Sequence, residues 1–138
     1  MTRYAGNQCI LTLEVEPLPE AVRNFAGMVR DCDGVSASSP EYVRAIPGGL
    51  KNAIDWLVSR DELIGKPIAK LHASHRGGDM LGQLRQVLAT VSQRFSEDPF
   101  LRFDLMKMSP DGIMHHFEAP EHRLAVKDFL DRLAARCG

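Results

Sequence analysis

Short apolar runs predict the strands of this chain. Residues 9–15 alternate apolar and polar side chains, which predicts a half-buried strand. The runs 34–38 and 67–73 consist mainly of small and apolar residues, which predicts strands buried on both faces of a sheet. Residues 100–106 alternate in part and predict one more strand.

Between these runs, apolar residues recur at helical spacing. The stripes predict helices over residues 19–32, 50–58 and 80–91, the last of them capped by Asp79. A final helix is expected from Pro120 to the end of the chain. Strands that alternate with helices predict an α/β fold, in which a mostly parallel sheet carries helices on both faces.

Composition agrees with one small globular domain over residues 1–138. The chain is 44% hydrophobic and 25% charged, with a formal net charge of −1 and no basic block, which argues against a nucleic-acid partner. Its three cysteines are widely spaced, which favours a reducing, cytoplasmic compartment over a secreted one. No apolar run approaches the roughly 20 residues that span a bilayer, so we expect neither a membrane partner nor a signal peptide.

The most informative stretch runs from residue 38 to residue 56. The predicted strand ends at Ser39-Pro40, a loop follows, and Pro47-Gly48-Gly49 leads into the helix that contains Trp56. Ligands of open α/β sheets bind in loops at the carboxyl ends of strands. The position of residues 39–46 therefore predicts a ligand-binding loop.

At these residues the chain resembles the NADPH-dependent FMN reductase family, flavodoxin-like proteins that include quinone, chromate and azo-dye reductases. The resemblance rests on Pro40-Glu41-Tyr42, Pro47-Gly48 and the helix from Leu50 to Trp56, in the family's order and spacing. Gly65-Lys66-Pro67 then leads into a strand, and residues 73–78 resemble the family's second flavin-side loop. The resemblance covers roughly residues 17 to 106.

The resemblance implies a flavodoxin-like fold with FMN and NADPH as cofactors. Hydride would pass from nicotinamide to flavin and on to a quinone or similar small acceptor, and the cofactors rather than an acid or base of the protein would carry that chemistry. It also implies a homo-oligomer, a dimer or a tetramer. The expected flavin-binding residues are Ser39, Pro40, Glu41, Tyr42, Val43 and Arg44 in the first loop, and Ser74, His75, Arg76 and Gly77 in the second.

Two features depart from the family pattern. Val43 replaces the Asn that follows Tyr in the family, which removes a polar side chain beside the expected flavin ring. Residues 1–16 contain no Gly-Ser-x-Arg-x-x-Ser sequence, the loop that holds the FMN phosphate in the family. The fold is therefore expected to be N-terminally truncated or altered, and a second hypothesis is a non-catalytic interaction or oligomerisation module.

Several residues allow more than one interpretation. Taken alone, Tyr42 also fits an ordinary surface aromatic, and residues 74–78 also fit a simple strand-to-helix turn. Glu41 is expected to make a structural hydrogen bond, whereas Arg44 would either bind the phosphates of NADPH or lie in solvent. Lys70, in the middle of a buried strand, requires water or a carboxylate for its ammonium group.

The C-terminal third offers no predicted catalytic or metal-binding residue. His115 and His116 are adjacent, so in a strand their rings would point to opposite faces, and no metal site is expected. Pro110-Asp111-Gly112 predicts a turn. The remaining expectation is that certain methionines fill the core or an interface, namely Met106, Met108 and Met114.

Overall fold

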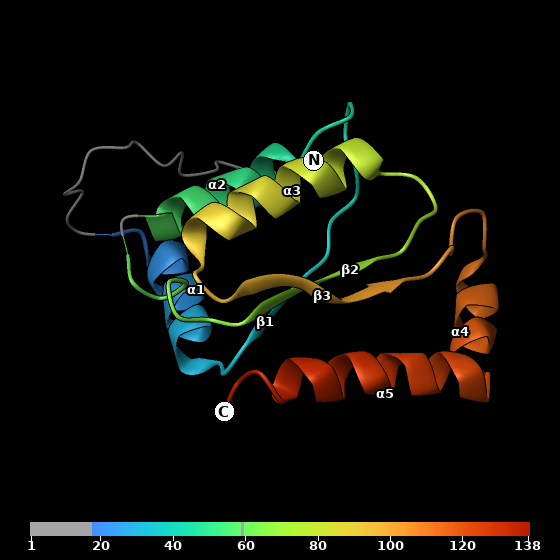
Figure 1. The fold of residues 1–138 in the computed structure, drawn as a ribbon. Coiled ribbons are helices and arrows are strands. Elements are labelled where there is room, and N and C mark those ends of the chain that lie inside the picture. The colour runs from blue at the N-terminus through green and yellow to red at the C-terminus, as the bar shows by residue number, and fades with distance from the viewer. Residues whose placement is uncertain (1–17, 59) are drawn as a thin grey trace.

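A computed structural model describes residues 18–58 and 60–138, in which a parallel sheet lies between two layers of helices (Figure 1). The elements in chain order are α1 (Glu20–Asp31), β1 (Val35–Ala37), α2 (Gly48–Val58), β2 (Ile68–His72), α3 (Gly78–Val91), β3 (Phe95–Arg102), α4 (Pro110–Glu118) and α5 (Pro120–Ala134). The strands of this part of the chain pair in the order β1-β2-β3, and both pairs are parallel. The predicted α/β architecture is confirmed, and the strand expected over residues 9–15 lies outside the described residues.

The alternation of side chains along β2 creates two cores. Ile68 faces a large cluster to which α1, α2 and α3 contribute, whereas Ala69 packs on the opposite face against Phe129 and Leu133 of α5. Both faces of this central strand are therefore covered, as its apolar run predicted.

The prediction of two-sided burial is wrong for β1. Val35 and Ala37 are half-buried on the face of the helices α1–α3, but Ser36 is exposed on the other face. Within the described residues β1 is an edge strand. The helix α5 packs against β2 and β3 and leaves Ser36 of β1 exposed. The short run of small residues at 34–38 therefore forms an edge strand of which only one face is covered by helices.

The third strand begins earlier than its sequence pattern predicted. β3 spans Phe95–Arg102 instead of residues 100–106, because its register with β2 pairs Lys70 with Phe100 and His72 with Arg102. Polar, partly exposed residues at its start conceal the strand pattern. The apolar residues after Arg102 pack elsewhere: the ring of Phe103 meets Phe117 edge to face, with 5.0 Å between the ring centroids.

The predicted turn at residues 110–112 is instead the start of α4. The hydroxyl of Ser109 accepts a hydrogen bond from the amide of Gly112 at 3.1 Å, and Pro110 occupies the first turn, where its missing N–H costs nothing. His116 therefore lies in a helix, where its ring stacks on His122 of α5 with 3.6 Å between centroids. Met108 and Met114 are exposed, so core packing is wrong for both, and their place in an interface stays a prediction.

Lys70 is buried on the same face of β2 as Ile68, the face covered by α1, α2 and α3. Its ammonium group lies 5.7 Å and 5.5 Å from the ring centroids of Phe95 and Phe100, close enough for cation–π attraction. Burial lowers the pKa of Lys70, and the nearby carboxylate of Glu97 opposes this shift. The rings of Phe95 and Phe100 and the carboxylate of Glu97 therefore replace the hydration that the ammonium group loses on burial.

None of the helices in residues 18–58 and 60–138 has both the length and the hydropathy required to cross a membrane.

Candidate functional site

The loop after β1 ends in a tight hairpin. Tyr42 and Ala45 exchange two main-chain hydrogen bonds of 3.1 Å and 2.9 Å. Between them, Val43 and Arg44 have φ angles of 49° and 61°, the combination required by a type I′ turn. The side chains of Tyr42 and Val43 are exposed at the tip, to 62% and 99% respectively.

This hairpin is fastened to the first turn of α3. A carboxylate oxygen of Glu41 accepts a hydrogen bond from the amide of Met80 at 3.0 Å, which satisfies one of the open amides of the helix start. Arg44 pairs with Asp79 at 2.5 Å, and this carboxylate raises the pKa of the guanidinium. The structural role predicted for Glu41 is confirmed, whereas Asp79 lies inside the first turn and the cap position belongs to Gly77.

A side chain further along α3 holds the other half of the hairpin. The amide group of Gln83 donates to the carbonyl of Arg44 at 3.1 Å and accepts from the amide of Ile46 at 3.3 Å. The loop after β1 is thus bound to α3 through both its side chains and its main chain.

The loop after β2 is held by hydrogen bonds from the last residues of β2 and β3. His72 and Arg102 are register partners in β2 and β3. The ring nitrogen Nε2 of His72 lies 2.7 Å from the carbonyl oxygen of Arg76, and Arg102 donates to the same oxygen at 3.0 Å and to the carbonyl of Ser74 at 2.7 Å. Because a carbonyl only accepts hydrogen bonds, the His72 proton is on Nε2.

Side chains of the loop make further contacts at its outer end. The hydroxyl of Ser74 accepts from the amide of Arg76 at 3.0 Å, and His75 lies 2.9 Å from a carboxylate oxygen of Asp104. The hydrogen bond from His75 holds the pKa of the Asp104 carboxyl below its usual value. The loop after β3 therefore supports the loop after β2.

Gly77 joins this loop to α3 in a conformation that demands glycine. Its φ is +94°, and a Cβ atom at this position would lie 2.6 Å from Nε2 of His72. Gly77 is therefore required by the packing of the loop on His72.

Each predicted site residue can now be placed. Ser39 is buried and its hydroxyl donates to the carbonyl of Pro40, so it turns away from solvent. Among the predicted site residues, those exposed are Pro40, Tyr42, Val43, Arg44, His75 and Arg76. The sequence did not single out the residues that fix the loops, namely Gln83, Arg102 and Asp104, because each belongs to a different element and follows no motif.

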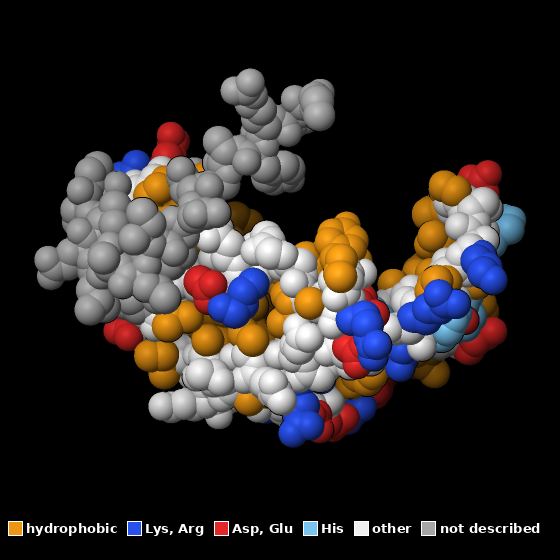
Figure 2. Space-filling model, turned by 90° about the horizontal axis from the view of Figure 1, so that it is seen from above, with side chains coloured by type: hydrophobic (Ala, Val, Ile, Leu, Met, Phe, Trp, Pro, Cys, Tyr) orange, Lys and Arg blue, Asp and Glu red, His pale blue; other side chains and the backbone are white. Residues whose placement is uncertain are grey.

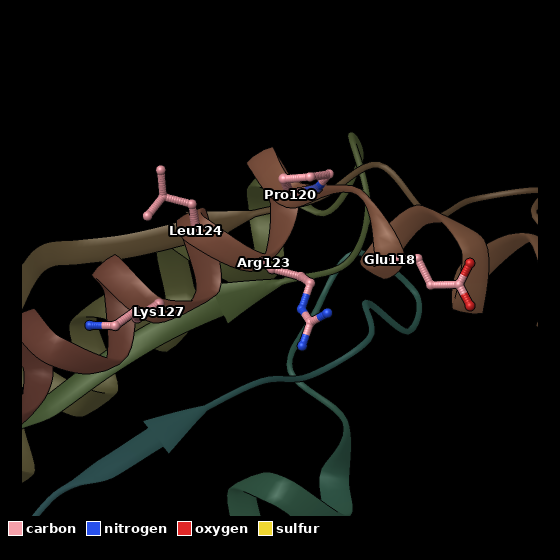
Figure 3. A pocket seen from close by; sticks show the side chains of 5 residues that line it. All are labelled: Glu118, Pro120, Arg123, Leu124 and Lys127. Carbon is pink, nitrogen blue, oxygen red and sulfur yellow. The ribbon is translucent and has the colours of Figure 1, made fainter.

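The two loops lie at one end of the sheet, beside the start of α3 (Figure 1). Seen from above, an arm that carries α4 stands apart from the rest of the molecule, and the surface between them is hollowed (Figure 2). A second concave surface lies at the corner of α4 and α5, lined by Glu118, Pro120, Arg123, Leu124 and Lys127 (Figure 3). None of the predicted site residues lines that pocket, and no group of candidate metal ligands occurs within the described part of the chain.

The family model of the NADPH-dependent FMN reductases matches residues 2–98. The chain belongs to this family. The match begins at residue 2, so it includes the N-terminal segment that has no recognisable phosphate loop.

Curated relatives agree with this assignment. The chain is 47% identical over 55 residues to a quinone reductase of Escherichia coli, a stretch that covers 38% of this chain and 29% of that protein. It is 36% identical over 121 residues to the CrdA subunit of an NADH:(hydroxy)cinnamate reductase of Vibrio ruber, and 30% identical over 125 residues to a 2-hydroxy-1,4-benzoquinone reductase of a Burkholderia species. These two matches cover 85% of this chain and 60% and 67% of the relatives.

A solved structure supports the fold. The flavoenzyme FerB of Paracoccus denitrificans, an NAD(P)H:(acceptor) oxidoreductase, superimposes with a TM-score of 0.66 at 24% identity, covering 87% of this chain and 71% of FerB. The predicted flavodoxin-like fold is confirmed.

The family's Asn at the hairpin tip now has a conformational explanation. At φ 49° the β-branched Val43 is strained, whereas Asn adopts such angles readily. The replacement by Val therefore affects the backbone as well as the polarity of the loop.

The donor groups of the two loops fit the ring of FMN. An isoalloxazine ring offers a flat face and hydrogen-bond acceptors along its rim. In the described part of the chain the amides of Gly77, Gly78 and Asp79 donate to no acceptor, and the ring of Tyr42 is exposed nearby on the hairpin. The sequence has no counterpart of the family's Gly-Ser-x-Arg-x-x-Ser loop, which holds the FMN phosphate in the family.

Proposed function

We propose that this chain binds the isoalloxazine ring of FMN between its two loops and takes part in the NAD(P)H-dependent reduction of a quinone or a similar small acceptor. The observation that carries this proposal is the meeting of the loops after β1 and β2 at the start of α3, where Glu41 reaches across to the amide of Met80. This is the edge of a parallel sheet at which ligands of such folds bind.

Two sets of residues form the proposed site. In the first loop, Ser39 to Arg44 place the hairpin, and the exposed ring of Tyr42 would lie against the flavin. In the second loop, Ser74 to Gly77 would contribute mainly main-chain groups, since the side chains of Ser74 and His75 are engaged within the protein. When bound, FMN would supply the hydride chemistry, and the protein would orient it.

A partner chain is also part of this proposal. The family resemblance implies a homo-oligomer, and α2 carries the ion pair Lys51–Asp55 on its surface. We therefore propose a homo-oligomer, which sedimentation of the purified protein would detect and a monomer at all concentrations would contradict.

A second candidate function is an interaction module without flavin. The supporting observation is that β1 is the edge strand of the described sheet and presents the exposed Ser36, while no phosphate loop occurs in the sequence. An open edge of this kind can pair with another strand.

Absorbance separates the two functions. The purified protein, mixed with FMN and freed of excess by gel filtration, should keep a flavin spectrum that NADPH bleaches. A colourless protein that retains no FMN would contradict the enzyme and leave the interaction module.

A pair of substitutions tests the first loop in the same assay. Tyr42→Ala should weaken FMN binding by about tenfold, since a base–aromatic stacking contact of this size is worth about 1–3 kcal/mol, whereas Tyr42→Phe keeps the ring and should bind nearly as the wild type does. Equal affinity in all three proteins would reject Tyr42 as a flavin contact.

A further inference from the structure

The carbonyl of Arg76 is the best-held main-chain group of the loop after β2. It accepts from Nε2 of His72 at 2.7 Å and from the guanidinium of Arg102 at 3.0 Å. His72 itself is buried, so its ring cannot swing aside, and Arg102 is anchored a second time on the carbonyl of Ser74. Two donors from two strands therefore fix the orientation of one peptide group.

The orientation of that carbonyl determines where the next amide points. The peptide between Arg76 and Gly77 is trans and planar, so the N–H of Gly77 points opposite to the Arg76 carbonyl. Because the carbonyl is directed at His72 and Arg102, the N–H of Gly77 is directed away from the strand ends. It donates to no acceptor in the described part of the chain.

The peptide between Ser74 and His75 shows that a held carbonyl does not always leave the next amide without an acceptor. Arg102 also holds the carbonyl of Ser74, but the amide that follows, that of His75, faces the carboxylate of Asp104. The amide of Met80 is likewise satisfied, by Glu41. Between these two satisfied donors, the amides of Gly77, Gly78 and Asp79 are left open in sequence.

We infer that Arg102 and His72 are positioning residues, which direct the amide of Gly77 toward an acceptor atom on the rim of the isoalloxazine. The inference rests on the proposed function. Gly77 is suited to this task because its φ of +94° turns the chain from the held carbonyl directly into α3. Neither residue needs to touch the flavin. They act by preventing a peptide flip that would replace the donor with a carbonyl.

Arg102→Met tests the inference, because Arg102 is exposed and its replacement leaves the core intact. The variant should bind FMN about tenfold more weakly than the wild type, the effect of losing one well-placed hydrogen bond. Arg102→Lys, which can donate to one of the two carbonyls, should recover part of the loss. The matched control is Arg136→Met, because Arg136 also donates to two main-chain carbonyls, those of Asp98 and Arg94, and lies outside both loops.

Two readouts distinguish positioning from a general loss of structure. In the wild type, added FMN should shift the ¹⁵N–¹H resonance of Gly77, and this shift should disappear in Arg102→Met while the thermal midpoint stays close to that of Arg136→Met. The reduction potential of the bound flavin should also change in Arg102→Met only, since a donor at the ring rim favours the reduced, more negative form.

The outcomes are separable. A wild type that binds no FMN overturns the proposed function and this inference with it. A wild type that binds FMN, with an Arg102→Met variant that keeps its affinity, its Gly77 shift and its potential, overturns the positioning role alone.

Discussion

The two loops of the proposed site are held in opposite ways. The loop after β1 is held against α3: the side chains of Glu41 and Arg44 bond to the first turn of that helix, and Gln83 of α3 bonds to the main chain of the loop. The loop after β2 is held by the strands, because His72 and Arg102 at the strand ends donate hydrogen bonds to one of its carbonyl groups. The first loop supplies two of the side chains that hold it, Glu41 and Arg44, whereas the carbonyl groups of the second are held by residues outside it.

This difference explains why only the first loop is conspicuous in the sequence. Two of the side chains that fix residues 39–46, those of Glu41 and Arg44, lie among those residues, and Glu41 belongs to the recognisable motif Pro40-Glu41-Tyr42. The second loop is fixed largely through its carbonyl groups, which are main-chain atoms and do not depend on the side chain they accompany. Its requirements fall on Gly77 and on two strand ends that are far apart in the sequence.

The largest effect is expected from Gly77→Ala in the second loop. The new methyl group would lie 2.6 Å from Nε2 of His72, at a φ of +94°. We expect the free energy of unfolding to fall by roughly 2 to 4 kcal/mol, from backbone strain and overpacking together. Denaturant unfolding measures the loss. Gly78→Ala is the control, because its Cβ meets nothing within 4 Å, and it should cost nothing; equal losses would show that the contact with His72 is unimportant.

A smaller effect is expected from Glu41→Ala in the first loop. The substitution removes the acceptor of the Met80 amide, and we expect a loss of about 1 kcal/mol in the free energy of unfolding, as for other lost helix caps. Glu41→Gln keeps a side-chain oxygen and should lose less. If both variants unfold like the wild type, the bond from Met80 does not hold the loop.

Val43→Asn should stabilise the first loop. Val43 is a β-branched residue at φ 49° with its side chain in solvent, so Asn relieves strain and removes no contact. The expected gain is about 1 kcal/mol in the free energy of unfolding. Val43→Thr keeps the branch at Cβ and serves as the control, and a gain of the same size in Thr would point to polarity instead of backbone strain.

The smallest effect concerns acid and the second loop. Because the pKa of Asp104 is lowered in the folded protein, its carboxylate stabilises the fold fully above the ordinary value of 3.8, and this contribution is lost as the pH falls through the lowered pKa. Asp104→Asn lacks it at every pH. The thermal midpoints of the two proteins should therefore differ slightly near neutrality and converge below pH 3.8, whereas a difference that persists in acid would exclude the Asp104 carboxylate as its cause.

Local sequence determined much of the fold. The apolar run of β2 and the stripes of α1, α2 and α3 predicted their elements because each is buried along a regular period. The order of the motif between Pro40 and Trp56 predicted the family, which the match over residues 2–98 confirmed. Where two signals competed, the local pattern was misleading: Ser109-Pro110 starts a helix through a cap that the turn signal at Asp111-Gly112 concealed.

Tertiary structure decided the start of β3 and the fastening of the second loop. The register with β2 placed Arg102 beside His72, which no spacing in the sequence indicates, because the two residues are brought together only by pairing of parallel strands. The sequence by itself determined the family of the chain and predicted a ligand loop after β1. Only the folded chain showed that the second loop is oriented by a histidine and an arginine acting on its carbonyl groups, since main-chain hydrogen bonds leave no signature in side-chain identity.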